Sequence, residues 1–371
     1  MIRVVEAISD ANIGGAGRLL INRIKNADRS CFDYTVVLPK GSLLSASLRE
    51  IGVKVVEINA CSNKSFDIKG TVELYKIIKK ISPDILNSHA CMSARIAGKL
   101  AAVRVNLYTR HCDFPIKSIY SIKPVRALQC AIDDCLSDGI IAVSSSAKRN
   151  LLLRGAPKEK IKVIVNGAEP LEKLRSTEKK KIRTGLKIPV DAIVVSIFAR
   201  LEAYKDHKTL LRAAYLLREN KNIYFLIVGG GSLEQKLKCY AKMLGISNRV
   251  IFTGFVDDVT ALMNITDINV NCSIGTETSS LALSEGMSVG IPAIASDYFG
   301  NRYMVKNGVN GFIFPQGNHI ALARKILRLS SDKALYSRLS KNARRRFLGE
   351  LNAERMTRET EEYYASLLKR N

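Results

Sequence analysis

The stretch IVVSIFARLEAYKDHKTLLRAAYLL, residues 193–217, decides the fold of this chain. A short apolar run, Ala192–Ala199, has the length and composition of a buried strand, and a polar loop follows it. A helical pattern then starts at His207. Strand, loop and helix in this order form part of a β-α-β unit, and such units build parallel sheets.

Apolar runs of strand length recur along the chain in two sets. The first set consists of Arg3–Ile8, Tyr34–Leu38, Val53–Ile58, Asp84–His89, Asn106–His111, Gly139–Val143 and Lys162–Val165. The second set follows a strongly basic segment, 171–187, and consists of Ala192–Ala199, Ile223–Val228, Val250–Gly254, Asp267–Asn271, Pro292–Ser296 and Gly311–Phe314. We therefore predict an α/β protein with two Rossmann-like, doubly wound domains, residues 1–168 and 169–350. A C-terminal helix in 351–371 carries an apolar stripe that packs against the body.

The length and composition are those of a globular protein. At roughly 100–200 residues per domain, 371 residues favour two domains. The chain is 25% charged and 47% hydrophobic, which excludes a disordered, collagen-like or low-complexity protein. No apolar run approaches the roughly 18–20 residues of a membrane span, and the first residues lead straight into a strand pattern. We therefore expect a cytoplasmic protein without a signal peptide.

The eight cysteines do not form a metal or disulfide pattern. None stands in a C-x-x-C motif, and the closest pair, Cys130 and Cys135, has no His or Cys partner nearby in the sequence. We interpret the cysteines as small buried hydrophobic residues in a reducing compartment.

The formal net charge is +24, and the excess is spread over the whole chain. Residues 1–168 hold 26 basic and 14 acidic residues, and residues 169–371 hold 32 and 20, so each half carries +12. A basic protein attracts anionic partners, which include nucleic acid, acidic lipid and phosphate-bearing substrates. The charge alone does not choose among them.

Three loops that follow predicted strands contain residues suited to binding a phosphate. Gly14 and Gly15 follow the first strand and open a helix, although the spacing is not G-x-G-x-x-G and does not predict NAD. Arg200 and Lys205 stand five residues apart after another strand, as cations that bind a diphosphate or are simply solvated. Gly229 begins a third loop of this kind, and Val256 follows the next strand, where a nucleobase can be held. Each loop alone is equally typical of a plain turn.

The sequence GTETSSLALSEG, residues 275–286, is the most specific of the motifs. Glu277 and Glu285 stand eight residues apart, with Ser280 and its neighbours as candidate caps of a helix that carries Glu285. The free N–H groups between the two acids would face an anion, and each carboxylate can accept two hydrogen bonds from a vicinal diol. The alternative is an exposed helix with solvated acids.

Two of the four histidines, His89 and His111, end predicted strands of the first domain, where ligands of α/β sheets bind. Of these, the position of His111 favours a functional role. No H-E-x-x-H, D-x-D or Cys/His cluster is present in the sequence, so we expect no metal site and no cofactor.

Taken together, these motifs resemble the family-4 retaining glycosyltransferases of GT-B fold. The resemblance covers essentially the whole chain and is carried by Glu277-x7-Glu285, Arg200, Lys205, Gly14-Gly15, Val165-Asn166-Gly167 and Phe252-Thr-Gly-Phe255. It implies two Rossmann-like domains that face each other across a cleft. The first would bind the acceptor and the second the nucleotide sugar, and the final helix would cross back to the first domain.

The resemblance also implies roles for single residues. Arg200 and Lys205 would neutralise the donor diphosphate, Glu285 would hold the ribose, and Glu277 would bond hydroxyls of the transferred sugar. His111 would face that sugar near its anomeric carbon. The donor-binding set comprises Gly14, Gly15, Gly229, Val256, Ser279, Ser280, Leu281 and Glu285. One departure is that Asn301, Arg302 and Tyr303 follow Gly300, where the family often has a second glycine and an acid.

The resulting expectation is a retaining, metal-independent hexosyltransferase of cell-envelope polysaccharide biosynthesis. Its donor would be a UDP-sugar, and its acceptor a saccharide or a lipid-linked saccharide. The alternatives are a nucleotide-sugar epimerase of the same fold and a basic protein that binds nucleic acid or membrane surfaces. We expect no nucleic-acid partner, because the sequence contains no helix-turn-helix, RNP-like or zinc pattern.

A basic and apolar segment of the first domain suggests peripheral attachment to the inner face of an anionic membrane. A solvated loop is the alternative. The segment contains Lys117, Ile119, Tyr120, Ile122, Lys123, Val125 and Arg126.

Overall fold

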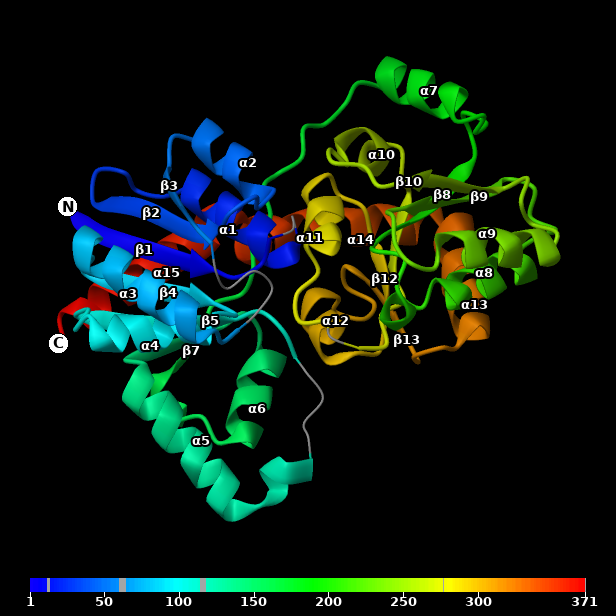
Figure 1. The fold of residues 1–371 in the computed structure, drawn as a ribbon. Coiled ribbons are helices and arrows are strands. Elements are labelled where there is room, and N and C mark those ends of the chain that lie inside the picture. The colour runs from blue at the N-terminus through cyan, green and yellow to red at the C-terminus, as the bar shows by residue number, and fades with distance from the viewer. Residues whose placement is uncertain (12–13, 60–64, 114–117, 276, 371) are drawn as a thin grey trace. The chain divides into compact units, whose positions relative to one another are not determined.

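The computed structural model describes residues 1–11, 14–59, 65–113, 118–275 and 277–370. The chain forms two compact units, Met1–Gly167 together with Ala353–Asn371, and Ala168–Asn352. Each unit is built on one parallel sheet with helices packed on its faces (Figure 1). The predicted α/β class, with two doubly wound sheets, is confirmed.

The sheet of the first unit has seven strands in the order β3-β2-β1-β4-β5-β6-β7, and all neighbours are parallel. The strands are β1 (Ile2–Ile8), β2 (Phe32–Pro39), β3 (Lys54–Ile58), β4 (Ile85–His89), β5 (Val105–Arg110), β6 (Gly139–Ala142) and β7 (Ile161–Val163). The strand order reverses between β1 and β4. The loops that follow these two strands meet, because Ser9 Oγ donates to the Ala90 carbonyl at 3.0 Å. Ligands of open α/β sheets bind at such a switch point.

Alternation along β1 decides what each face of this sheet contacts. Val5 and Ala7 belong to an apolar cluster formed with helices α3 (Ile68–Ile81) and α4 (Met92–Leu100). Glu6, between them, points to the opposite face. Helices α1 (Gly15–Lys25) and α15 (Ala353–Leu368) pack together on that face. The C-terminal helix, red in Figure 1, is thus part of the first unit.

The remaining helical elements of this unit connect the strands. They are α2 (Leu44–Glu50), η1 (Ser118–Ser121), α5 (Lys123–Leu136), α6 (Ser145–Arg154) and η2 (Lys158–Lys160).

The sheet of the second unit has six parallel strands in the order β10-β9-β8-β11-β12-β13. They are β8 (Ile193–Phe198), β9 (Ile223–Val228), β10 (Val250–Gly254), β11 (Ile268–Asn271), β12 (Ala293–Ser296) and β13 (Gly311–Phe314). Here the order reverses between β8 and β11. The loops after these two strands contain Arg200, Lys205 and Glu277.

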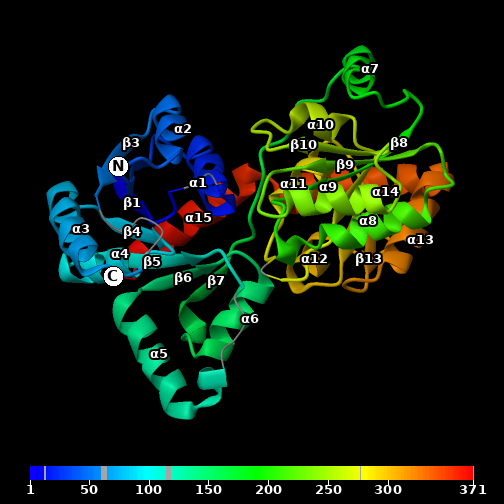
Figure 2. The ribbon, with the colours of Figure 1, turned by 45° about the vertical axis from the view of Figure 1, so that its right-hand side comes forward.

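Both faces of the second sheet are buried. Val195 and Ile197 pack under α8 (His207–Leu216) and α13 (His319–Ser331), which contact each other. Val194 lies in a cluster on the other face. The other α-helices, labelled in Figure 2, are α7 (Ser176–Gly185), α9 (Glu234–Met243), α10 (Thr260–Asn264), α11 (Leu281–Ser288), α12 (Phe299–Met304) and α14 (Lys333–Arg346). Two short helical turns, η3 (Ala203–Lys205) and η4 (Phe347–Leu351), complete the unit.

The interpretation of the cysteines as buried residues is wrong for several of them. Cys91 and Cys272 are buried, but Cys31, Cys135 and Cys239 are exposed. The apolar neighbours of a cysteine in the sequence do not decide which side of a helix or turn its own side chain takes. All the described cysteines are free thiols, and Cys61 lies outside the described residues. Among the described helices, none combines the length and the apolar character that crossing a membrane requires.

Candidate active site

The loops after β8 and β11 lie against each other at the carboxyl edge of the second sheet. The Ile274 N–H donates to the Tyr204 carbonyl at 2.9 Å, which joins the two loops directly. This contact brings Lys205 to Glu277, and Lys205 Nζ lies 2.5 Å from Glu277 Oε2. Two residues separated by 72 positions in the sequence thus form an ion pair.

The Glu277 carboxylate is held through one of its two oxygens. Oε2 accepts hydrogen bonds from Lys205, from Ser273 Oγ at 2.9 Å and from Asn271 Nδ2 at 3.2 Å. The described residues supply no hydrogen bond to Oε1. Only 7% of the residue is exposed, so the alternative of an exposed helix with solvated acids does not hold for Glu277. The carboxylate is therefore fixed in place through Oε2.

The electrostatic environment keeps Glu277 ionised. Burial alone would raise the pKa of this carboxyl, but Lys205 and the hydrogen bonds from Asn271 and Ser273 hold its pKa below the ordinary value. An ionised carboxylate only accepts hydrogen bonds, so its partners must be donors such as sugar hydroxyls.

A second layer of buried amides supports this carboxylate, and sequence reasoning missed it. Asn301 Nδ2 lies 3.3 Å from Asn271 Oδ1 and also donates to Ser296, so it orients the amide that bonds Glu277. Asn301 is one of the residues at which the chain departs from the family pattern. Polar residues at the carboxyl ends of buried strands were the available signal in the sequence.

Arg200 is exposed, whereas Lys205 is partly buried. Its guanidinium lies 6.0 Å from the centre of the Tyr204 ring, and Lys205 Nζ lies 5.5 Å from the same ring. The described residues give Arg200 no ion pair. Tyr204 therefore lies near both predicted cations, in a position that sequence reasoning did not identify.

Helix α11 begins where the cap was predicted. The Ser280 side chain accepts from the Leu283 N–H at 3.4 Å, and Leu281 is the first residue of the helix. Ser279 is buried beside Met304. Glu285 is half-buried on the same helix. The second acid of the motif and the N–H groups of the first turn thus belong to one short element.

The structure gives Gly229 a structural reason for being glycine. Its φ is +140°, and a Cβ there would lie 2.2 Å from the Ala199 carbonyl oxygen. The backbone at Gly229 therefore packs closely against the start of the loop that carries Arg200. Val256 is partly buried against the apolar cluster beneath β10. Donor binding by Gly229 and Val256 stays a prediction.

In the first unit the predicted residues lie at the carboxyl edge of the sheet. Gly14 precedes α1, and a Cβ on Gly15, the first residue of that helix, would meet open space. His111 follows β5, and its Nε2 lies 2.7 Å from His89 Nδ1. Both histidines line a cavity of about 340 Å³. Its charged lining residues are Asp10, Arg95, Arg110, Asp133 and Arg154.

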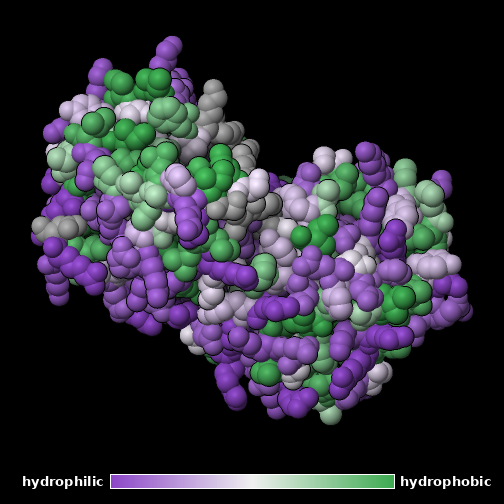
Figure 3. Space-filling model, turned by 90° about the horizontal axis from the view of Figure 1, so that it is seen from below, coloured by the Kyte–Doolittle hydropathy of each residue, from purple (hydrophilic) through white to green (hydrophobic). Residues whose placement is uncertain are grey.

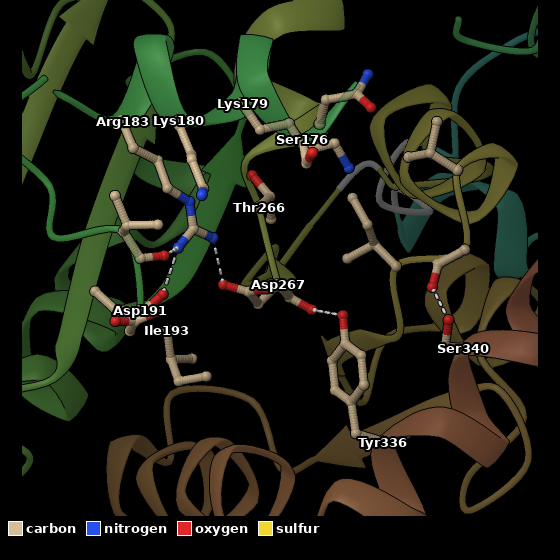
Figure 4. Close-up of a pocket in the computed structure, with 16 residues that line it drawn as sticks. Ser176, Lys179, Lys180, Arg183, Asp191, Ile193, Thr266, Asp267, Tyr336 and Ser340 are labelled. Carbon is tan, nitrogen blue, oxygen red and sulfur yellow. Dashed lines mark hydrogen bonds and ion pairs between the residues drawn. The ribbon is translucent and has the colours of Figure 1, made fainter. Parts of the chain in front are cut away.

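A cavity of about 440 Å³ lies at the opposite, amino edge of the second sheet (Figure 4). There Arg183 pairs with Asp267 at 2.9 Å, and the Tyr336 hydroxyl donates to the Asp267 carbonyl at 3.1 Å. These bonds tie α7 and α14 to the start of β11. None of the predicted site residues lines this cavity.

The structure thus assembles Arg200, Lys205, Glu277 and the start of α11 within one unit, and His111 with the Gly14 loop within the other. Among the described residues, no group of three or more His, Cys, Asp or Glu side chains is arranged to hold a metal ion.

Two family models match the chain. The model described as "Glycosyl transferases group 1" matches residues 178–346, and that described as "Glycosyltransferase Family 4" matches residues 13–170. A similar Escherichia coli protein is the UDP-Gal:alpha-D-GlcNAc-diphosphoundecaprenol alpha-1,3-galactosyltransferase. It is 27% identical over 96% of this chain and 95% of its own length.

Solved structures share the fold over the full length. Anabaena HepE in complex with UDP and glucose has a TM-score of 0.85 and 22% identity, covering 99% of this chain and 100% of its own. A glycosyltransferase from Rickettsia africae has a TM-score of 0.86 and 22% identity, covering 100% of both chains.

Proposed function

Because the chain belongs to the group 1 glycosyltransferases and has the GT-B fold, we propose that it transfers a hexosyl unit from a UDP-sugar with retention of configuration. The acceptor is a glycan or a lipid-linked saccharide of cell-envelope polysaccharide biosynthesis. The observation that carries the proposal is the Glu277 carboxylate, which is anchored through Oε2 by three donors and receives no hydrogen bond at Oε1 from the described residues.

A nucleotide-sugar donor accounts for the chemistry of the second unit. Oε1 of Glu277 accepts from a hydroxyl of the transferred sugar, and Glu285 holds the ribose. Uridine as the nucleoside is supported by the UDP complex of HepE and by the name of the E. coli relative. The diphospholipid acceptor in that name supports a lipid-linked acceptor here.

The cations of the β8 loop stabilise the leaving group. As the bond between the anomeric carbon and the diphosphate oxygen breaks, negative charge grows on the diphosphate. In this proposal Arg200, Lys205 and the N–H groups at the start of α11 stabilise that charge, and electrostatic stabilisation of this kind supplies much of the rate enhancement of many enzymes. In this proposal these groups neutralise the leaving diphosphate without a metal ion.

Retention of configuration follows if the acceptor attacks from the face that the diphosphate leaves. The acceptor oxygen then forms its bond to the anomeric carbon on that face, and its proton passes to the departing diphosphate oxygen. No covalent sugar–enzyme intermediate is required. His111 and the Gly14 loop belong to the acceptor-binding unit, where His111 faces the transferred sugar.

Peripheral membrane attachment is a separate part of the proposal. Ile122 and Leu128 are exposed beside the exposed cations Lys123 and Arg126 on and before α5. Apolar side chains flanked by cations suit an anionic lipid surface. Hydrophilic side chains cover most of the face shown in Figure 3, with small apolar patches between them. Lys117 lies outside the described residues.

Vesicle flotation tests this attachment. We expect the protein to float with vesicles that contain anionic phospholipid and not with neutral ones. Replacing Lys123 and Arg126 by glutamine should abolish flotation, whereas replacing Lys236 and Lys242 on α9 of the second unit should not. Equal flotation of the two double variants would contradict this part of the proposal.

A donor screen tests the transfer reaction. The protein is incubated with UDP-, GDP- and ADP-sugars in the presence of a chelator, and nucleoside diphosphate release and thermal stability are followed. We expect stabilisation by UDP-sugars and slow release of UDP. Both effects should be lost in Glu277→Ala and kept in Glu219→Ala, which removes an acid with 83% side-chain exposure from the same unit. Stabilisation by no nucleotide sugar would contradict the proposal.

A further inference from the structure

The cavity of about 340 Å³ in the first unit is lined by three guanidinium groups and two carboxylates. The guanidiniums belong to Arg95, Arg110 and Arg154, and the carboxylates to Asp10 and Asp133. Arg95 and Asp133 neutralise each other, because their nearest nitrogen and oxygen lie 2.7 Å apart. Asp10 follows β1, which β4 separates from β5 in the sheet. The lining near the end of β5 is therefore positively charged.

Arg154, the last residue of α6, is held in this lining by neutral groups. Its guanidinium donates to the Tyr120 hydroxyl at 2.8 Å and lies 4.7 Å from the centre of the Tyr120 ring. The described residues give Arg154 no ion pair. The helix ends at Gly155, whose φ is +100°, and a Cβ there would lie 2.5 Å from the Arg126 carbonyl oxygen. The end of α6 is thus packed against the start of α5, which fixes the position of the Arg154 charge.

Tyr108 adds a hydroxyl group to the same cavity. Tyr108 and Arg110 are alternate residues of β5, so their side chains project from one face of the sheet. The Tyr108 ring packs against the apolar cluster beneath α6, and the Arg95 guanidinium lies 4.1 Å from the centre of the ring. The described residues supply no hydrogen bond to the Tyr108 hydroxyl. Because largely buried polar groups are nearly always hydrogen-bonded, this hydroxyl indicates that a ligand binds in the cavity.

The polar groups near the end of β5 can all donate hydrogen bonds. Burial, and after it the charge of Arg154, lowers the pKa of the Arg110 guanidinium. Burial raises the pKa of Tyr108, so its hydroxyl keeps the proton. Asp113, the next acid along the chain, does not line the cavity and accepts from side chains of α6. Two guanidiniums and a hydroxyl suit an anion that offers only acceptor oxygens, as phosphate and diphosphate do.

We propose that Tyr108, Arg110 and Arg154 form a subsite for a phosphate or diphosphate group of the acceptor. This assignment rests on the proposed transfer reaction, in which the first unit binds a saccharide or a lipid-linked saccharide. Helix α5 contributes Gln129 to the cavity lining, while its Leu128 is exposed. The helix thus borders the cavity and also presents an apolar side chain to its surroundings, as a diphosphate joined to an apolar chain requires.

Titration with inorganic pyrophosphate tests the subsite without any sugar transfer. The protein is first saturated with UDP, so that the donor site is filled, and pyrophosphate binding is measured by calorimetry. We expect the affinity to fall about tenfold to a hundredfold in Arg154→Gln, the usual loss for a hydrogen bond to a charged group. Lys158→Gln removes an exposed cation of the same unit and should bind as wild type does. No binding to wild type, or equal binding by the two variants, would overturn the proposal.

A matched pair of tyrosine variants separates ligand contact from packing and replaces the arginine variant if that one fails to fold. Tyr108→Phe removes the hydroxyl in the cavity and keeps the ring. Tyr75→Phe removes the hydroxyl of a partly buried tyrosine on α3 that does not line the cavity. We expect pyrophosphate affinity to fall about fivefold to tenfold in Tyr108→Phe and to stay unchanged in Tyr75→Phe. Equal affinity in the two variants would overturn the role of Tyr108.

Kinetics with two acceptors test whether the phosphate belongs to the acceptor. Transfer is measured to a saccharide linked to a lipid diphosphate and to the same saccharide as a methyl glycoside. We expect Arg154→Gln to raise the KM of the diphosphate-linked acceptor about tenfold or more, and to leave the KM of the glycoside and of the donor unchanged. Equal rises for the two acceptors would overturn the assignment.

Two further outcomes are distinguishable. Pyrophosphate binding that depends on Arg154, with no change in either acceptor KM, would assign the subsite to free phosphate or pyrophosphate and overturn its role in acceptor binding. If wild type transfers no sugar, the proposed function fails, while the pyrophosphate titration still decides whether the subsite exists.

Discussion

At the scale of single residues, the two cations of the β8 loop, Lys205 and Arg200, differ in burial and in ion pairing. The Lys205 side chain is 17% exposed and pairs with a Glu277 side chain that is 9% exposed. Arg200 is exposed, and the described residues give it no ion pair. Removing one partner of a buried ion pair leaves an uncompensated charge, whereas an exposed cation contributes little to stability.

We therefore predict that Lys205→Ala and Arg200→Ala both reduce sugar transfer strongly but differ in stability. Lys205→Ala should lower the free energy of unfolding by about 3 kcal/mol. Arg200→Ala should change it by less than about 0.5 kcal/mol, as surface substitutions usually do. Urea unfolding at pH 7, with donor turnover measured in parallel, checks both values. Equal stability of the two variants would show that the ion pair does not hold Glu277.

His207 is a buried imidazole at the start of α8. It is 2% exposed, and neither ring nitrogen has a hydrogen-bond partner among the described residues. Burial, with a smaller effect of Lys205, lowers the pKa of His207 from 6.5 to about 4. Between these two pH values the unfolded chain binds a proton at this site and the folded chain does not.

We predict that His207 makes the protein less stable as the pH falls. The group contributes fully to stability above pH 6.5 and loses its contribution as the pH falls toward 4. The loss should amount to about 3 kcal/mol, since each pKa unit corresponds to about 1.4 kcal/mol. In His207→Leu this part of the pH dependence should vanish. Parallel curves of unfolding free energy against pH for the two proteins would refute the assignment.

At the scale of elements, helix α12 is packed against the loop that carries Glu277. A Cβ on Gly300 would lie 2.3 Å from the Glu277 carbonyl oxygen and 2.5 Å from that of Thr278. Both neighbours are backbone atoms, which cannot move aside as a flexible side chain can. The helix and the loop must therefore separate if this glycine gains a side chain.

We predict that Gly300→Ala weakens donor binding by displacing Glu277. The affinity for the UDP-sugar, measured by calorimetry, should fall by tenfold or more, because displacing the loop also disturbs the Oε2 contacts. Gly185→Ala at the end of α7 is the matched control, since a Cβ there has no neighbour within 4 Å. Unchanged affinity in Gly300→Ala would mean that the loop accommodates the methyl group without moving the carboxylate.

At the scale of the whole molecule, the chain leaves the first unit after Gly167 and returns to it at Ala353. Helix α15 then covers one face of the first sheet, where Tyr364 and Leu367 are buried. A Cβ on Gly139 would lie 2.5 Å from the Tyr363 hydroxyl, so β6 and this helix are in close contact. The first unit is therefore completed only by the last residues of the chain.

We predict that a chain ending at Asn352 retains a folded second unit and loses the first. Without α15, Glu6 and Arg23 are exposed to water. The apolar side chains of the first unit that pack against α15 are then exposed as well. Limited proteolysis should remove the first unit and leave a fragment of about residues 168–352. A chain ending at Leu368 serves as control and should resist proteolysis as wild type does. Equal resistance of both chains would contradict the prediction.

The elements were predictable because their signals are local. Apolar runs such as Ile193–Phe198 and Ile223–Val228 are short, buried on both faces and followed by helical patterns. The cap at Ser280 and the buried stripe of α15 are likewise written into neighbouring residues. Domain class, strand positions and the loops of interest therefore follow from periodicity alone.

The contacts inside the candidate site were not predictable in this way, because strand order decides them. Glu277 meets Lys205 since β8 and β11 are neighbours in the sheet, and His111 meets His89 since β4 and β5 are. Gly229 was predicted as a ligand contact, which stays a prediction, and the sequence did not indicate that a Cβ at this position would meet the Ala199 carbonyl.

The sequence by itself determined the two doubly wound sheets, the loops at their carboxyl edges and the family to which the chain belongs. Only the tertiary structure decided which oxygen of Glu277 is held, how Asn301 supports it, and that Tyr364 reaches Glu6 from the far end of the chain. The physical reason is the separation in the sequence over which each kind of interaction acts. Hydrophobic periodicity acts between neighbours in the sequence, whereas hydrogen bonds between buried groups depend on distances that the assembled sheet alone sets.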